Sequence, residues 1–110
     1  MREKFVAFAS EEIKHAFEEL GKGKFEDLQL LGFLRRAIDD LKKNPLIGIN
    51  IPKNLIPREY IVKFDVDNLR KYDLPNGWRL LYTIKGDDIM IISVLIEWLD
   101  HKNYERRFGY

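Results

Sequence analysis

The hydrophobic and polar positions divide the chain into a helical first half and an extended second half. Residues 4–9 are mostly apolar and predict a short first strand. Ser10 is a good N-cap for a first helix that ends at Gly21. A second helix is predicted from about residue 25 to 43, before Asn44-Pro45 stops it. Its apolar stripe contains Leu28, Leu31, Leu34, Ile38 and Leu41.

Residues 46–58 are apolar but interrupted by glycine and proline. This mixture predicts an ordered connector that lies over the core rather than a flexible linker. Because proline favours the first position of a helix, Pro57 predicts a short helix over about 58–64. A strand over 60–64 is the alternative.

From residue 69 the apolar pattern takes a period of two, which predicts antiparallel strands at 69–74, 78–84 and 89–99. Pro75-Asn76-Gly77 marks the first hairpin turn and residues 85–88 the second. The last strand is apolar on both faces, so we expect it in the middle of the sheet. The order of elements predicts an α+β fold, with an N-terminal strand and a helical hairpin packed on one face of an antiparallel sheet.

Composition narrows the possible functions. The 110 residues are expected to form a single domain, residues 1–110. The chain has 19 Lys and Arg against 18 Asp and Glu, a formal net charge of +1, which excludes nucleic-acid binding by bulk charge. With no Cys and two His, neither a disulfide framework nor a metal site is expected. No apolar segment predicts a membrane span or a secretory signal, so we expect a cytoplasmic protein.

Several polar residues in the second half of the chain are placed where they could form a catalytic or anion-binding site. Alternation along the strand at 69–74 places Lys71 and Asp73 on one face. Arg79 begins the next strand, where an unpaired charge would be costly, so it needs a carboxylate such as Asp73 or Glu97, or an anionic ligand. His101 and Tyr104 follow the last strand, where side chains from neighbouring strand ends can meet.

Two motifs in this region resemble a known family. Residues 77–82, Gly-Trp-Arg-Leu-Leu-Tyr, are similar to the Gly-aromatic-Arg-aliphatic-aliphatic-Tyr signature of the RelE/ParE superfamily of type II toxin–antitoxin toxins. Residues 100–105, Asp-His-Lys-Asn-Tyr-Glu, resemble the C-terminal His-x-x-Tyr segment of its HigB-like branch. Those toxins have a strand, a helical hairpin and three further antiparallel strands, the order predicted here. The connector is longer, and the net charge closer to neutral, than in typical members.

The resemblance implies a toxin that acts as a ribosome-dependent endoribonuclease. Such a toxin enters the ribosomal A site and cleaves mRNA by attack of a ribose 2′-OH on the adjacent phosphorus. Its implied partners are the ribosome, mRNA and a cognate antitoxin, and this chemistry requires no metal or cofactor. The implied catalytic residues are Arg79 on the phosphate, His101 for proton transfer, Tyr104 as proton donor or base-stacking ring, and Lys71 as a further cation, with Lys102 and Trp78 binding the substrate.

Each of these residues also has a structural interpretation. Arg79 can form an ion pair with Asp73, His101 can be an ordinary surface residue, and Tyr104 can cover the edge of the sheet. Glu97 is either the catalytic base or a partner of Arg79. At the level of function, the alternatives are a non-enzymatic protein of the same fold, either a gyrase-poisoning toxin or an inactive interaction module.

Overall fold

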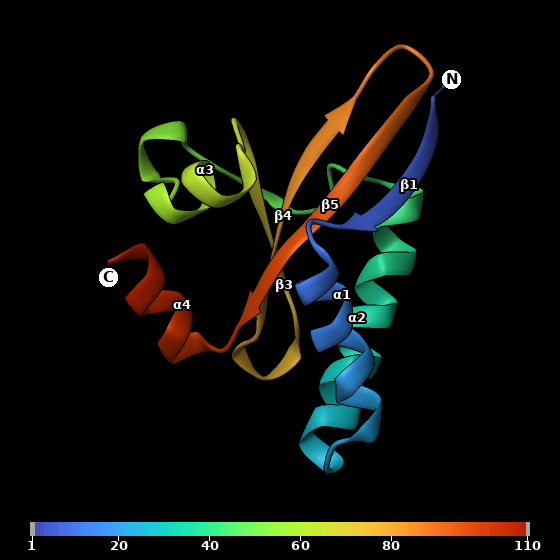
Figure 1. Cartoon of the computed structure of the whole chain (residues 1–110), viewed down its shortest axis with the longest axis vertical. Helices are drawn as coiled ribbons and strands as arrows, with labels where there is room; N and C mark the ends of the chain where they lie inside the picture. The colour runs from blue at the N-terminus through green and yellow to red at the C-terminus, as the bar shows by residue number, and fades with distance from the viewer. Residues whose placement is uncertain (1, 110) are drawn as a thin grey trace.

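The computed structural model describes residues 2–109 and shows a mixed sheet with helices on both of its faces (Figure 1). The elements are β1 (Glu3–Phe8), α1 (Glu11–Glu19), α2 (Phe25–Lys43), β2 (Ile49–Ile51), α3 (Arg58–Phe64), β3 (Leu69–Asp73), β4 (Arg79–Gly86), β5 (Met90–Leu99) and α4 (His101–Phe108). The α+β class predicted from the pattern is confirmed, as are the two long N-terminal helices and the helix after Pro57.

The five strands of the described region have the order β1-β5-β4-β3-β2. Strand β5 lies between β1 and β4, so its predicted central position is confirmed. The three C-terminal strands are antiparallel, but β1 pairs with β5 in parallel, with Phe5 opposite Ile92. The sheet is therefore mixed rather than purely antiparallel. The long chain segment between β1 and β5 allows either direction, since only tight hairpins force antiparallel pairing.

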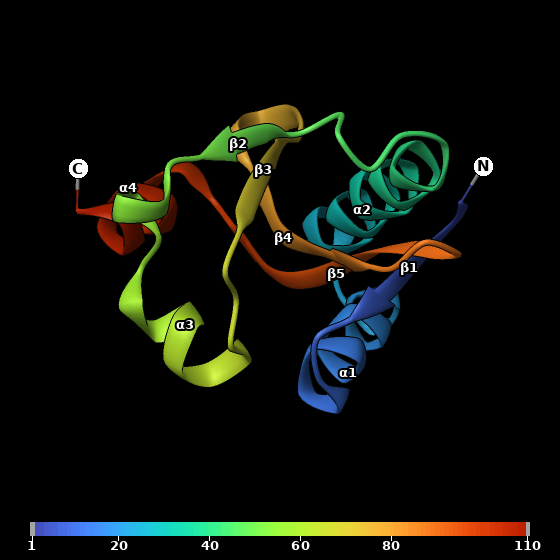
Figure 2. The ribbon, with the colours of Figure 1, turned by 90° about the horizontal axis from the view of Figure 1, so that it is seen from above.

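Helices lie on both faces of the sheet, as the view from above shows (Figure 2), and each face has its own core. Helix α2 covers one face, where Leu34 and Leu41 pack with Leu80, Tyr82 and other buried residues of β4 and β5. Helices α3 and α4 cover part of the opposite face, which we call the α3/α4 face. Its core contains Tyr60, Leu69, Leu81, Ile96, Leu99 and Tyr104.

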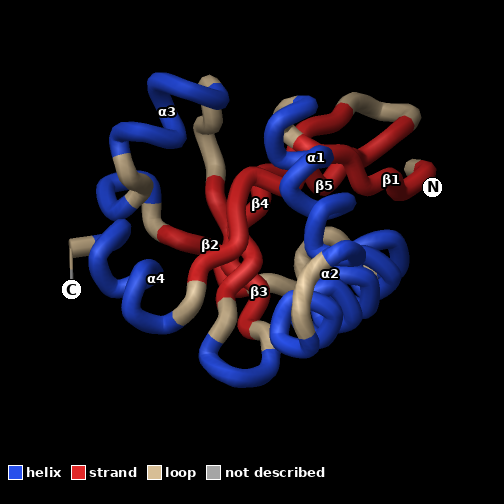
Figure 3. Tube along the Cα trace, turned by 60° about the horizontal axis from the view of Figure 1, so that its bottom comes forward, coloured by secondary structure: helices blue, strands red, loops and turns tan. Residues whose placement is uncertain are grey.

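The connector before α3 is ordered, as predicted, and part of it forms the edge strand β2 (Figure 3). The buried Tyr82 hydroxyl donates to the Pro45 carbonyl at 2.7 Å and accepts the Gly48 N–H at 3.0 Å. Arg70 donates to the Gly48 carbonyl at 2.7 Å. Only glycine fits position 48, because a Cβ there would lie 2.6 Å from the Tyr82 hydroxyl oxygen. These contacts fix the connector along β3.

Local signals explain where the helices begin. The Ser10 hydroxyl accepts the Ile13 N–H at 3.2 Å and caps α1, and the Asp100 carboxylate accepts the Asn103 N–H at 2.8 Å and caps α4. Across residues 2–109, no helix has the length and apolar character that a membrane crossing requires.

Candidate functional site

The residues selected from the sequence gather where the β3–β4 hairpin meets the end of β5 and the start of α4. Asp73 is paired with Arg79 across the hairpin, and Arg79 is paired on its other side with Leu99, the last residue of β5. Lys71 lies opposite Leu81, a member of the core on the α3/α4 face. Lys71, Asp73 and Arg79 therefore share that face, as the alternation along β3 predicts.

Two cations converge on one carboxylate oxygen. Asp73 Oδ1 lies 3.3 Å from Lys71 Nζ and 3.0 Å from Arg79 Nε. The second contact is electrostatic, since its angle does not make the Nε–H a hydrogen-bond donor. Arg79 Nη1 donates instead to the Gly77 carbonyl at 2.7 Å. The side chains of Lys71 and Arg79 are 22% and 19% exposed, whereas that of Asp73 is 50% exposed. Arg79 thus has the carboxylate partner that its position requires.

The ring of Tyr104 lies beneath both cations. Its centroid is 5.7 Å from Lys71 Nζ and 5.3 Å from Arg79 Cζ, within cation–π range. The residue is 6% exposed and packs on Phe108 with 4.5 Å between ring centroids. In this arrangement Tyr104 is a buried support for Lys71 and Arg79, and a base-stacking role would require its ring to become exposed.

His101 and Lys102 begin α4 and are both exposed. The His101 side chain is 65% exposed, and its Nε2 lies 2.5 Å from Glu105 Oε1 one turn later. His101 Cβ is close to Gly77, at 3.3 Å from where a Cβ on that glycine would lie. Because the Gly77 carbonyl also accepts from Arg79, His101 borders the paired cations.

Trp78 does not join this group. It is half-buried and packs against the core under α2, together with Leu80 and Leu95, on the opposite face of the sheet. The structure therefore brings together Lys71, Arg79, Tyr104 and His101, places Lys102 beside them on the first turn of α4, and separates Trp78 from them.

Glu97 has partners that the sequence did not indicate. Its Oε2 accepts the Tyr60 hydroxyl at 2.5 Å, and its Oε1 lies 3.5 Å from Arg107 Nη2. Arg107 also pairs with Glu59 of α3. Burial, and then the hydrogen bond to Glu97, raises the pKa of the Tyr60 hydroxyl well above its ordinary value. Glu97 therefore pairs with Arg107 and Tyr60 rather than with Arg79.

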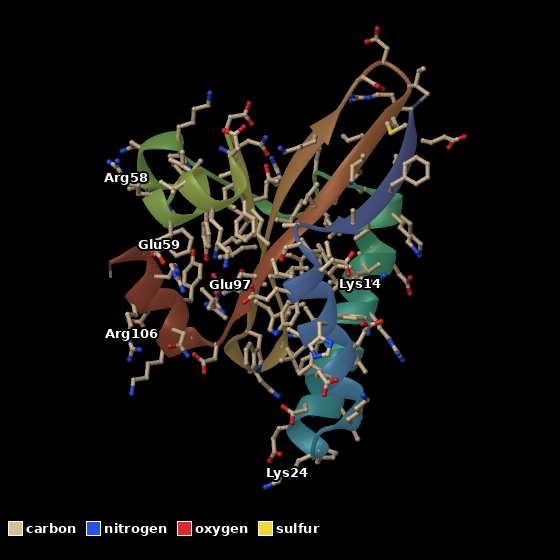
Figure 4. The ribbon with its side chains drawn as sticks, in the orientation of Figure 1. Lys14, Lys24, Arg58, Glu59, Glu97 and Arg106 are labelled. Atoms are coloured by element: carbon tan, nitrogen blue, oxygen red, sulfur yellow. The ribbon has the colours of Figure 1, made fainter. Side chains whose placement is uncertain are left out.

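A cleft of about 440 Å³ opens beside Glu97, between α1 on one side and α3 with α4 on the other (Figure 4). Its lining includes Ile13 of α1, Phe64 of α3 and Trp98 of β5. No sequence signal marks this cleft, because three helices and a strand from both halves of the chain form it. Among residues 2–109, no group of three or more His, Asp or Glu side chains is arranged to hold a metal ion.

Comparisons with protein-family models, curated proteins and solved structures find no match for this chain.

Proposed function

We propose that this protein is a toxin of the RelE/ParE type that cleaves mRNA on the ribosome. The observation that carries the proposal is the pair of cations, Lys71 and Arg79, held over the Tyr104 ring beside His101. Further support comes from the order of the elements, which agrees with what the resemblance implies: a strand, a helical hairpin, and three antiparallel strands.

The chemistry begins with a phosphate oxygen that replaces Asp73 between the two cations. The ribose 2′ oxygen then forms a bond to phosphorus while the bond from phosphorus to the 5′ oxygen breaks, which leaves a 2′,3′-cyclic phosphate and a 5′-hydroxyl. Lys71 and the planar fork of Arg79 stabilise the charge on the phosphorane. His101, oriented by Glu105, either accepts the proton from the 2′-OH or donates a proton to the leaving 5′ oxygen.

The near-neutral charge makes the ribosome an integral part of this proposal. Few cations are available to bind RNA, and Asp73 offsets two of them, Lys71 and Arg79, so free RNA should bind weakly. The site of action would be the cytoplasm. The proposed antitoxin would be a protein segment with a carboxylate that competes for Lys71 and Arg79.

The test is to map mRNA 5′ ends in cells that express the chain, with and without translation. Wild type should produce new ends only on translated messages, and Arg79→Ala and His101→Gln should abolish them. Matched controls are Arg35→Ala, on the exposed side of α2, and His15→Gln, because His15 pairs with Glu19 at i+4 as His101 does with Glu105. Both control variants should cleave as wild type does.

Three other outcomes would contradict either the site assignment or the function. Unchanged cleavage by both folded site variants would remove the site assignment. Gyrase-dependent DNA breaks without mRNA cleavage would assign the gyrase-poisoning alternative. Harmless overexpression without cleavage would assign an interaction module.

A further inference from the structure

The cleft between α1 and α3 is not used by the proposed cleavage chemistry. Its volume of about 440 Å³ lies in the range of sites for small ligands. It forms because β1 ends opposite Leu95, so that α1 rather than a strand flanks the last residues of β5. The cleft and the paired cations are neighbours, because Glu97 lies two residues before Leu99, the cross-strand partner of Arg79.

A β-bulge turns Glu97 into this cleft. Leu81 is opposite Glu97 and Tyr82 is opposite Leu95, which leaves Ile96 as the extra residue of β5. With regular alternation Glu97 would lie on the face covered by α2. The bulge instead puts Ile96 and Glu97 on the same side as Leu81. Bulges beside functional sites commonly re-aim a side chain in this way.

The Glu97 carboxylate is fixed in position but accessible. Tyr60 holds one oxygen and Arg107 lies near the other, while 31% of the side chain remains exposed. Since each carboxylate oxygen has two lone pairs, each can accept one more hydrogen bond from a ligand. The arrangement presents two adjacent acceptors to whatever enters the cleft.

The walls suit a flat, partly apolar ligand. Phe64 of α3 lines the cleft, and Ile13 adds an aliphatic surface from α1. Trp98 borders the cleft from β5, but its ring packs against the core under α2, with 6.5 Å between its centroid and that of Phe17. Aromatic side chains next to hydrogen-bonding groups are the usual means by which proteins bind an unstacked RNA base.

We infer that this cleft binds a guanine base of the RNA substrate and that Glu97 is its specificity-determining residue. Guanine has adjacent donors, N1–H and the N2 amino group, which match the two oxygens of a carboxylate. Adenine and cytosine have an acceptor nitrogen beside their amino group, and uracil has carbonyls on both sides of its N–H. Each of these bases would therefore place an acceptor atom against an acceptor oxygen of Glu97. The choice of RNA as the ligand rests on the proposed function.

The test is titration of the protein with the 5′-monophosphates of guanosine, adenosine, cytidine and uridine, followed by NMR of the backbone amides of Glu97 and Trp98. Wild type should bind the guanosine nucleotide about 10-fold or more tightly than the others. Glu97→Gln has nearly the same shape but replaces one acceptor with a donor, so it should lose this preference. Glu97→Asp keeps the charge but shortens the side chain by one methylene group, so it should weaken guanosine nucleotide binding. Glu19→Gln, a partly exposed ion-paired glutamate of α1, is the matched control and should bind as wild type.

The outcomes separate this inference from the proposed function. Equal affinity for the four nucleotides, or an unchanged preference in folded Glu97→Gln, would overturn the guanine site. Cleavage of mRNA without any base preference would overturn it too, and leave the proposed function standing. Guanosine selectivity in a protein that cleaves no mRNA would support the cleft assignment and contradict the proposed function.

Discussion

Asp73 and Arg79 face each other across the β3–β4 hairpin with 3.0 Å between Oδ1 and Nε, and the same oxygen also contacts Lys71. One carboxylate oxygen thus occupies the position between two cations that a phosphate oxygen would take. The protein carries an internal competitor for its proposed substrate, which agrees with a site that is active only when the ribosome presents the RNA.

Removal of this competitor should strengthen RNA binding. Asp73→Asn keeps the size of the side chain but releases Lys71 and Arg79 for an external anion. We expect affinity for a short RNA oligonucleotide to rise about 5-fold, because an ion pair with a half-exposed carboxylate contributes about 1 kcal/mol. Fluorescence anisotropy at two salt concentrations measures this, and the gain should shrink as salt increases.

The control for that measurement is Asp88→Asn, which removes an exposed carboxylate in the β4–β5 turn. It should leave affinity unchanged. If Asp73→Asn instead bound RNA as wild type does and only lowered the melting temperature, Asp73 would be a structural partner of Arg79 and not a competitor.

The Tyr104 ring should matter for stability and for activity. Tyr104→Leu removes a buried aromatic surface beneath Lys71 and Arg79, and we expect a loss of about 2 kcal/mol in the free energy of unfolding. Cleavage should fall at least 10-fold, since loss of the ring frees both cations to move. Tyr104→Phe keeps the ring and should retain more of the cleavage activity than Tyr104→Leu. Urea unfolding and mRNA end mapping provide the two measurements. Equal cleavage activity of the two variants would show that the ring does not contribute to cleavage.

The periodic parts of the chain were predictable because one face of each element is buried. Leu31, Leu34 and Leu41 of the predicted α2 stripe are buried, as expected. Leu28 is instead 49% exposed, and Leu30 and Ala37 are buried. The stripe that packs on the sheet is therefore Leu30, Leu34, Ala37 and Leu41, which belong to the core under α2.

Other features depended on tertiary contacts that no local pattern contains. Strand β2 has only three residues and exists because Tyr82 and Arg70 hold the connector along β3. Helix α4 follows the last strand directly, and its two core contacts, the buried Tyr104 and the partly buried Phe108, are too few for a periodic signal. The bulge at Ile96 was hidden because β5 is apolar on both faces. Because the sequence does not show on which face of β5 Glu97 lies, it also could not predict that Tyr60 and Arg107 contact this residue.

Stability should decline in alkaline solution. The Tyr72 hydroxyl donates to Asp40 Oδ2 at 2.5 Å, and this hydrogen bond, with burial, raises the pKa of Tyr72 to about 12 from 10.0. Because the native state holds the proton more tightly, the stabilisation is complete below about pH 10 and is lost as pH rises toward 12. Tyr60 and Tyr82 also have raised pKa values and act in the same direction.

Urea unfolding at pH 8 and at pH 11 measures this loss. Tyr72→Phe should be about 1 kcal/mol less stable than wild type at pH 8, because it lacks the hydrogen bond to a carboxylate. It should also lose less stability between the two pH values. A pH dependence that is the same in wild type and variant would show that Tyr72 does not contribute.

Two serines should respond to the same substitution with opposite signs. Ser93 is fully buried in β5, and its hydroxyl has no hydrogen-bond partner. Ser93→Ala removes a desolvated polar group and should raise the free energy of unfolding by about 1 kcal/mol. The Ser10 hydroxyl accepts the Ile13 N–H as the N-cap of α1, so Ser10→Ala should lower the free energy of unfolding by about 1 kcal/mol. Thermal or urea unfolding of both variants checks the pair, and a loss of stability in Ser93→Ala would mean that its hydroxyl is satisfied in solution.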